Sequence, residues 1–293
     1  MFVRTLESVG FTINPYDKCT TNKMIDGKQC TVTWYVDDIK ISHVDKSVVT
    51  SIIDKLQNEY GDFRAMRGNH HKLLGMEVNF MDDKTVTIST IDHVKDAIRA
   101  FTGELKGKIS NPANRNLFNV NPDLPRIDKD RADIFHSIVA KLLWLMKRGR
   151  PDIETVISFL CTRVCDPNEG DWMKLRRVLL YLSNIVNDIR VIGVDDLKTL
   201  VTMVDASYAV HPNMRSHTGG LMTFGRGILH GKSSKQKLNT KSSTESELVG
   251  VSEYLPYSLW MANFLKCQNY KLLKNTVYQD NQSTLRMARN GRN

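Results

Sequence analysis

The sequence lacks long apolar runs and has few cysteines, and both features narrow its class. No stretch approaches the roughly 20 apolar residues that a membrane-spanning helix needs, and the segment after Met1 lacks a secretory pattern. We therefore expect a soluble, intracellular protein, cytoplasmic or nuclear, with no membrane partner. The 5 cysteines lack zinc-finger spacing. Cys161 and Cys165 stand four apart in a predicted helix, and we expect both to be small buried hydrophobic residues rather than ligands.

Acidic residues are also fewer than basic ones. The chain has 41 Lys and Arg against 32 Asp and Glu, a formal net charge of +9. This excess favours a polyanionic partner, most simply nucleic acid. The remaining composition, 41% hydrophobic and 25% charged, is ordinary for a globular protein, and 293 residues are enough for two domains with separate cores. No internal repeat or low-complexity tract is present.

Apolar periodicity and turn residues divide the chain into helices and strands. Turns are predicted at Asn14-Pro15 and Asp26-Gly27, and a polar, proline-containing loop or linker over 102–131. The predicted helices cover 46–60, 92–101, 134–147, 152–165, 172–185, 244–267 and a short stretch from 282. The predicted strands cover 31–41 as a hairpin, 73–78, 85–88, 199–204, 219–224, 227–232 and 276–279.

The most informative local feature is the tip of the first hairpin, Tyr35-Val36-Asp37-Asp38. Two adjacent carboxylates repel each other unless a cation neutralises them, and magnesium prefers such hard oxygen ligands. The alternative is an ordinary turn that carries two solvated aspartates, because Asp is common in turns. The flanking alternation predicts apolar residues on one face of each strand: Val32, Trp34, Val36, Ile39 and Ile41.

A second set of acids lies in the last third of the chain. Asp205 closes a β-rich run, Glu245 and Glu247 lie in the first turns of a helix, and Asp280 ends a later strand. Acids in this order can converge on one point of an α/β layer, where a two-metal site could clamp both oxygens of a phosphodiester displacement. The alternatives are ordinary ones: glutamates that favour a helix N-terminus and an aspartate that caps the next helix.

The motifs around these acids resemble the polyproteins of copia-type LTR retrotransposons. The ribonuclease H part of the resemblance is carried by Val204-Asp205-Ala206-Ser207, Arg215–Gly220, Lys232–Lys237, Ser242–Leu248 and Asp280-Asn281-Gln282-Ser283. The reverse transcriptase part is carried by the hairpin acids, Leu73-Leu74-Gly75 and Arg150-Pro151-Asp152-Ile153. The resemblance covers essentially the whole chain, with the motifs in the same order.

The resemblance implies an α+β fold in three parts. These are a partial reverse transcriptase palm over 1–110, a helical thumb or connection region over 111–195, and an α/β ribonuclease H-like domain with a mixed sheet over 196–293, truncated at its C-terminus. It implies an RNA-directed DNA polymerase and ribonuclease H that use Mg²⁺ (or Mn²⁺) and act on RNA–DNA hybrids and template–primer nucleic acid. If the protein is cytoplasmic, the resemblance implies that it is associated with particles.

It also implies site residues. Asp37 and Asp38 correspond to the metal-binding hairpin acids of the polymerase. Asp205, one glutamate and Asp280 correspond to the ribonuclease H acids. Glu247 is preferred to Glu245, because a Leu-like residue typically follows the catalytic glutamate, although the choice stays open. Lysines of the basic segment would contact the phosphate backbone of a hybrid, unless they form a merely solvated loop: Lys232, Lys235, Lys237 and Lys241.

Two departures from the family pattern limit the expected activity. Polymerases of this class need a third metal-binding aspartate on an earlier strand, but only 34 residues precede Tyr35, and Asp17 and Asp26 lie in predicted turns. A further ribonuclease H region is expected after Asp280, and the sequence stops at Asn293. We therefore expect an incomplete polymerase site without activity. The alternatives are a catalytically inactive nucleic-acid-binding remnant and a non-functional relic with an incomplete fold.

Overall fold

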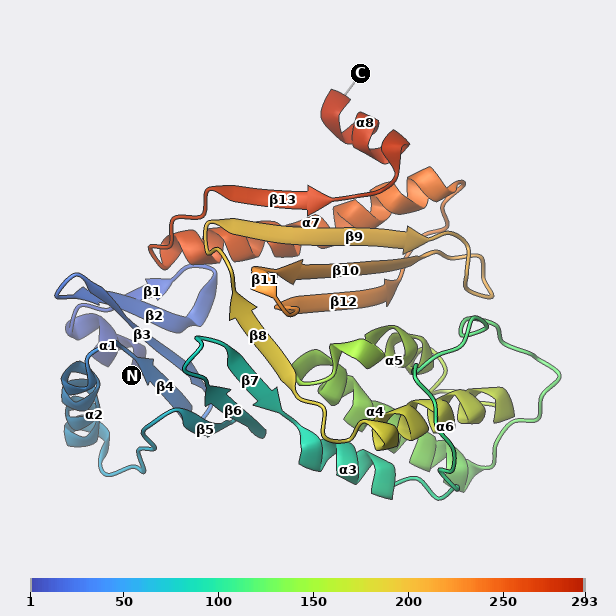
Figure 1. Ribbon diagram of the computed structural model, residues 1–293, viewed down its shortest axis with the longest axis horizontal. Helices are drawn as coiled ribbons and strands as arrows, with labels where there is room; N and C mark the ends of the chain where they lie inside the picture. The colour runs from blue at the N-terminus through green and yellow to red at the C-terminus, as the bar shows by residue number, and fades with distance from the viewer. Residues whose placement is uncertain (1, 292–293) are drawn as a thin grey trace.

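The computed structural model describes residues 2–291, and its elements form three neighbouring groups (Figure 1). Two sheets lie at the N-terminal side, a layer of helices lies beside them, and a third sheet backed by one long helix lies across both. Each of three buried apolar clusters belongs to one group. The coarse prediction of a mixed α and β fold with several sheets is therefore confirmed. Among the described residues, no helix is both long and apolar enough to cross a membrane.

The first group is an antiparallel sheet covered by two helices. The sheet order is β1-β2-β3-β4. Its elements are α1 (Phe2–Ser8), β1 (Thr12–Asn14), β2 (Asp17–Ile25), β3 (Lys28–Tyr35), β4 (Asp38–Ser42) and α2 (Lys46–Tyr60). Helix α2 starts where the Asp45 carboxylate accepts the Ser47 N–H and ends at Gly61, so the prediction for 46–60 is confirmed. Both predicted turns are present: Pro15 lies between β1 and β2, and Asp26-Gly27 joins β2 to β3.

A second sheet joins distant parts of the chain in the order β11-β8-β7-β6-β5. Its strands are β5 (His70–Leu73), β6 (Met76–Phe80), β7 (Val86–Ser89), β8 (Arg190–Val194) and β11 (Gly225–Arg226). The prediction of one strand over 73–78 is wrong only at its start, because 76–78 lie in β6, which pairs with β7, the strand predicted over 85–88. Leu74 and Gly75 form a tight turn with φ of 52° and 77°, so the chain folds back between β5 and β6. Strand β8 was not predicted.

The helical group packs around the largest apolar cluster. Its helices are α3 (Ile91–Arg99), α4 (Lys129–Arg148), η1 (Pro151–Ile153), α5 (Glu154–Cys161) and α6 (Glu169–Asn184). Helix α5 is shorter than the predicted helix over 152–165, because its last N–H groups bond three residues back and Pro167 follows. Cys165 therefore lies outside the helix and is exposed, and Cys161 is only partly buried, so the expectation that both are buried is wrong.

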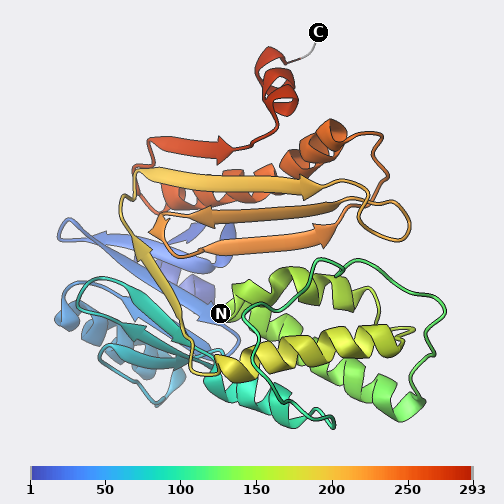
Figure 2. The same cartoon turned by 45° about the vertical axis from the view of Figure 1, so that its right-hand side comes forward.

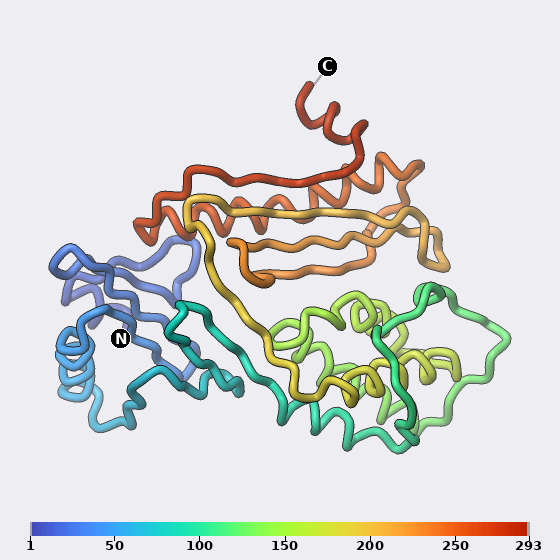
Figure 3. The backbone as a smooth tube through the Cα atoms, viewed as in Figure 1, coloured from blue at the N-terminus to red at the C-terminus, as the bar shows by residue number. Residues whose placement is uncertain are grey.

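The segment between α3 and α4 is a long loop that packs against the helices. Leu117 and Ile127 belong to the buried helical cluster, and Phe118 packs against it. Figure 3 shows this loop, coloured green, running out from α3 and back across the helices. The polar composition of this segment correctly predicted a loop.

The third group is a four-stranded mixed sheet with α7 across one face (Figure 2). The order is β12-β10-β9-β13, with β13 parallel to β9 and the other pairs antiparallel. Tyr254 of α7 is fully buried above Gly220 in the apolar cluster of this group. The elements are β9 (Thr199–Ser207), β10 (His217–Thr223), β12 (His230–Lys235), α7 (Ser243–Cys267), β13 (Lys274–Tyr278) and α8 (Gln282–Asn290).

Candidate metal centre

Three carboxylates from three separate elements meet at one end of the mixed sheet. Asp205 lies near the end of β9, Glu247 in the first turns of α7, and Asp280 just after β13. One carboxylate oxygen from each lies within 4.8 Å of the others. Asp205 and Asp280 are exposed, whereas Glu247 is 6% exposed. The structure thus brings together the three acids that the sequence singled out.

The end of strand pairing creates the gap that Glu247 fills. Strand β13 pairs with β9 only as far as the match of Tyr278 with Met203. Beyond that point two backbone groups on the same edge of β9 have no strand partner, and buried backbone groups need one. The N–H of Ala206 donates to the Glu247 carboxylate, and the carbonyl of Val204 accepts from the Gln279 side chain at 3.3 Å. The side chains of Glu247 and Gln279 therefore supply the hydrogen-bond partners that β13 no longer provides to β9.

Gln279 links all three acid-bearing segments, a role that no sequence pattern indicated. Its Nε2 donates to Glu247 Oε2 at 3.0 Å as well as to Val204 of β9. Its Oε1 accepts the N–H of Asn281 at 2.8 Å, which fixes the turn that carries Asp280. Adjacency to Asp280 in the sequence was the only available signal, and it does not distinguish Gln279 from any other neighbour.

The start of α7 explains why Glu247, not Glu245, reaches the cluster. Ser242 caps the helix by accepting the Glu245 N–H at 3.2 Å, and the Glu245 carboxylate accepts the Lys241 N–H at 2.6 Å. Glu245 is thus occupied at the helix N-terminus, as its charge favours. The buried side chain of Gln236 donates to the Ser246 carbonyl at 2.8 Å and holds this first turn against the sheet.

The electrostatics of the cluster suit a cation with hard oxygen ligands. Burial raises the pKa of Glu247, and the nearby charges of Asp205 and Asp280 raise it further, against the opposing effect of the hydrogen bonds from Gln279 and Ala206. A bound cation would relieve both the desolvation and the repulsion. Three carboxylates without nitrogen or sulfur ligands match Mg²⁺ or Mn²⁺.

The four lysines predicted to bind nucleic acid do not share one face. Lys232 points toward α7, where its Nζ lies 4.7 Å from the ring centroid of Tyr257. Lys235 lies on the opposite face of β12, which it shares with Asp205, because Asp205, Gly219 and Ser233 are directly paired across the sheet. Lys237 and Lys241 are exposed in the loop before α7.

The hairpin acids Asp37 and Asp38 lie apart from this cluster. Tyr35 pairs with Asp38, so Val36 and Asp37 form a two-residue turn, and both acids are exposed. Val36 is 80% exposed with a φ of 53°, so the expectation that it lies on a strand face is wrong. That angle costs a β-branched residue on the order of 1–3 kcal/mol. Within residues 2–291, no third His, Cys or carboxylate completes a ligand set with them.

Comparisons with known proteins find relatives of the same class that the sequence motifs resemble. The chain is 25% identical over 262 residues to the retrovirus-related Pol polyprotein from the tobacco transposon TNT 1-94, a match that covers 87% of the chain and 20% of the relative. It is 24% identical over 274 residues to the Ty1-DR6 Gag-Pol polyprotein of Saccharomyces cerevisiae, covering 88% of the chain and 16% of the relative. The chain thus spans about a fifth or less of these relatives. No family model matches.

A solved structure also aligns with most of the chain. It is the foamy viral protease-reverse transcriptase in complex with RNA/DNA hybrid, with a TM-score of 0.49 and 12% identity, covering 96% of this chain and 37% of that one. The sequence comparisons define the class: the homologues of this chain are retrotransposon Pol polyproteins. The resemblance to copia-type Pol polyproteins is therefore confirmed.

Proposed function

We propose that this chain is part of a retrotransposon reverse transcriptase whose C-terminal segment, 196–293, is a ribonuclease H-like domain. Residues 1–110 would be a partial palm and 111–195 a thumb or connection region. The observation that carries the proposal is the convergence of Asp205, Glu247 and Asp280 within 4.8 Å. The Pol polyprotein relatives support the same assignment.

The proposed reaction is cleavage of the RNA strand of an RNA–DNA hybrid. Asp205, Glu247 and Asp280 would hold divalent cations, which when bound can stabilise both the attacking and the leaving oxygen of a phosphodiester displacement. Glu247 is fixed by two hydrogen bonds, from Ala206 and Gln279, and so presents a preorganised ligand. The exposed side chains of Asp205 and Asp280 leave the cluster open to a polymeric substrate.

Basic residues near the cluster would hold the hybrid without reading its sequence. Lys235 lies on the face of Asp205, and Lys237 and Lys241 lie in the loop that leads into α7. Contacts of this kind provide affinity that falls with salt. Lys232 is assigned no such contact here, because its charged group lies against Tyr257.

The test is cleavage of a labelled RNA–DNA hybrid in Mg²⁺ or Mn²⁺ by the full chain. We expect cleavage that Asp205→Asn abolishes and that Glu245→Gln, which removes an acid two positions from Glu247, leaves largely intact. Cleavage that survives Asp205→Asn contradicts the site assignment. Salt-dependent binding of the hybrid without metal-dependent cleavage would instead favour the alternative, a catalytically inactive nucleic-acid-binding remnant.

A further inference from the structure

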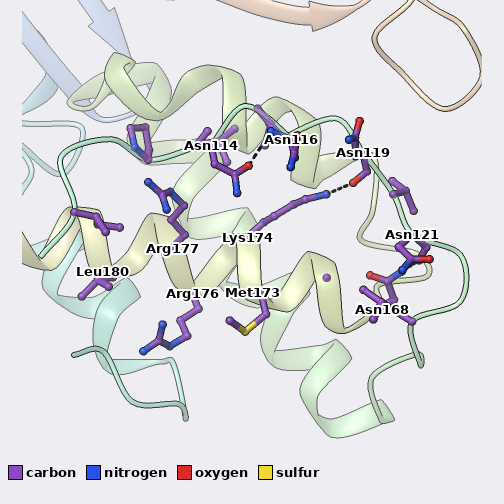
Figure 4. Close-up of a pocket in the computed structure, with 18 residues that line it drawn as sticks. Asn114, Asn116, Asn119, Asn121, Asn168, Met173, Lys174, Arg176, Arg177 and Leu180 are labelled. Carbon is purple, nitrogen blue, oxygen red and sulfur yellow. Dashed lines mark hydrogen bonds between the residues drawn. The ribbon is translucent and has the colours of Figure 1, made fainter. Parts of the chain in front are cut away.

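A pocket of about 440 Å³ lies in the helical group, and its lining includes neither set of acids (Figure 4). Its outer wall is the long loop between α3 and α4, over 109–124, and its inner wall is one side of α6. This volume falls within the range of sites that hold small ligands.

The charge lining this pocket has one sign. Lys174, Arg176 and Arg177 of α6 all line it, and none of its lining residues is Asp or Glu. The two acids of α6, Glu169 and Asp171, pair instead with arginines outside the pocket. Among residues 2–291, none of these three cations forms an ion pair with a carboxylate. Asp171 acts on Lys174 only at longer range, so the pocket carries a net positive charge.

The three cations are held in place by neutral acceptors of the loop. Lys174 Nζ donates to the Asn119 carbonyl at 2.6 Å, as Figure 4 shows, and Arg176 Nε donates to the Glu104 carbonyl at 2.8 Å. Arg177 donates to the side chain of Asn111, but its buried Nε has no hydrogen-bond partner among the described residues. Leaving a buried donor of a charged group unpaired is costly, so an acceptor that reaches the Arg177 guanidinium would stabilise it.

The rest of the lining combines amides with apolar side chains. Asn114 accepts the Asn116 N–H with its Oδ1, which leaves its NH₂ group available. Apolar side chains also line the pocket: Leu117, Val120, Val156 and Leu180. Amides recognise the polar edges of bases, guanidinium groups recognise phosphate, and apolar side chains accept a planar ring.

We propose that this pocket binds a nucleotide, with its phosphate at Arg176 and Arg177 and its base against the asparagine amides and the apolar lining residues. The nucleotide could be free or could be one unit of a strand, since the recognised chemistry is the same. This inference does not depend on the acid cluster, which lies in a different group of elements.

The test is isothermal titration of the full chain with AMP, adenosine, inorganic phosphate and a short single-stranded DNA. Working in EDTA excludes binding through cations at the acid cluster. We expect AMP to bind more tightly than adenosine or phosphate alone. Arg177→Gln should weaken AMP binding on the order of tenfold, because it removes a charge-assisted contact. Arg176→Gln, at a partly exposed residue, serves if the first variant does not fold.

Two controls separate pocket binding from general charge and from the proposed function. Lys141→Gln removes the same charge from an exposed position on α4 and should leave AMP binding unchanged. Asp205→Asn should also leave it unchanged. Binding of both AMP and the DNA supports a strand unit, and binding of AMP alone supports a free nucleotide. Absence of AMP and DNA binding at millimolar concentration, or equal weakening by Lys141→Gln and Arg177→Gln, would overturn the proposal.

Discussion

At the scale of single residues, Gln279 is the side chain that holds the acid cluster together. It bonds to Glu247, to the strand of Asp205 and to the turn of Asp280. Gln279→Leu keeps a similar volume but removes these bonds. Partners of metal ligands typically contribute 10–100-fold to metal affinity, so we expect about that loss in Mn²⁺ affinity, measured by electron paramagnetic resonance.

The control for this variant is Gln282→Leu, the same substitution at an exposed position three residues further on. It should bind Mn²⁺ as the wild type does. Equal affinity of Gln279→Leu and the wild type would show that the glutamine does not position the ligands.

Gly220 and Gly219 form a matched pair of adjacent glycines on β10. A Cβ on Gly220 would lie 2.2 Å from the ring of Tyr254, which is fully buried and cannot move aside, whereas a Cβ on Gly219 meets nothing closer than 4.0 Å. Gly220→Ala should lower the free energy of unfolding by about 1–3 kcal/mol. Gly219→Ala should change it little. Denaturant titration decides, and equal effects of the two variants would contradict the packing described here.

The site could be predicted from the sequence only in part, and the reason is visible in these residues. Several carboxylates that converge need a cation to neutralise them. Asp205, Glu247 and Asp280 could therefore be predicted from the sequence as metal ligands. Gln279 could not be predicted, because a glutamine is equally common as a solvated surface residue. Its role arises only where β13 stops pairing with β9.

At the scale of elements, local patterns predicted most helices and strands. Helix 46–60 has its apolar stripe, cap and terminating glycine within its own sequence. The helix predicted over 244–267 is present despite an exposed Pro256 in its interior, because other helix residues such as Tyr254 and Met261 pack in the apolar cluster of the mixed sheet. Strand β8 was missed because its partner β7 lies about a hundred residues earlier, and the Leu74-Gly75 turn was missed inside an apolar run.

A buried pair of histidines joins the mixed sheet to the helical group. His211 Nε2 lies 3.0 Å from His217 Nδ1, and His217 Nε2 lies 2.7 Å from the hydroxyl of Ser233, which reaches Thr155 of α5. Phe118 of the long loop packs on both rings. Burial lowers the pKa of each histidine to about 4, helped by Lys235 at His211 and by His211 at His217.

This pair predicts a loss of stability in mild acid. In the unfolded chain both histidines titrate near 6.5, so below that pH the unfolded state binds protons that the folded state excludes. The free energy of unfolding should then fall as the pH drops from 6.5 toward 4, by on the order of 2 kcal/mol per histidine at pH 5. Denaturant titrations across this range measure the slope.

The slope of the free energy of unfolding against pH, rather than its absolute value, shows whether the two histidines cause the loss of stability. His217→Gln should flatten the pH dependence even if it lowers stability at every pH. His136→Gln, at an exposed histidine of α4, should leave the slope unchanged. Identical slopes in the wild type and His217→Gln would contradict this explanation.

At the scale of the whole molecule, the two sets of acids differ in the number of carboxylates that they bring together. Asp37 and Asp38 lie on an exposed turn without a third ligand among residues 2–291, whereas the C-terminal acids form a set of three. We therefore expect no primer extension by this 293-residue chain on an RNA template in Mg²⁺ or Mn²⁺. Detectable extension that Asp37→Asn abolishes would show that the hairpin is sufficient.

The proposed function requires that Asp205, Glu247 and Asp280 act together as a divalent cation site. The most direct measurement is a Mn²⁺ titration followed by electron paramagnetic resonance, comparing the wild type with Asp205→Asn, Asp280→Asn and Glu245→Gln. We expect Mn²⁺ binding that Mg²⁺ displaces, that each aspartate variant loses and that Glu245→Gln retains. Equal binding by the wild type and both aspartate variants would contradict it.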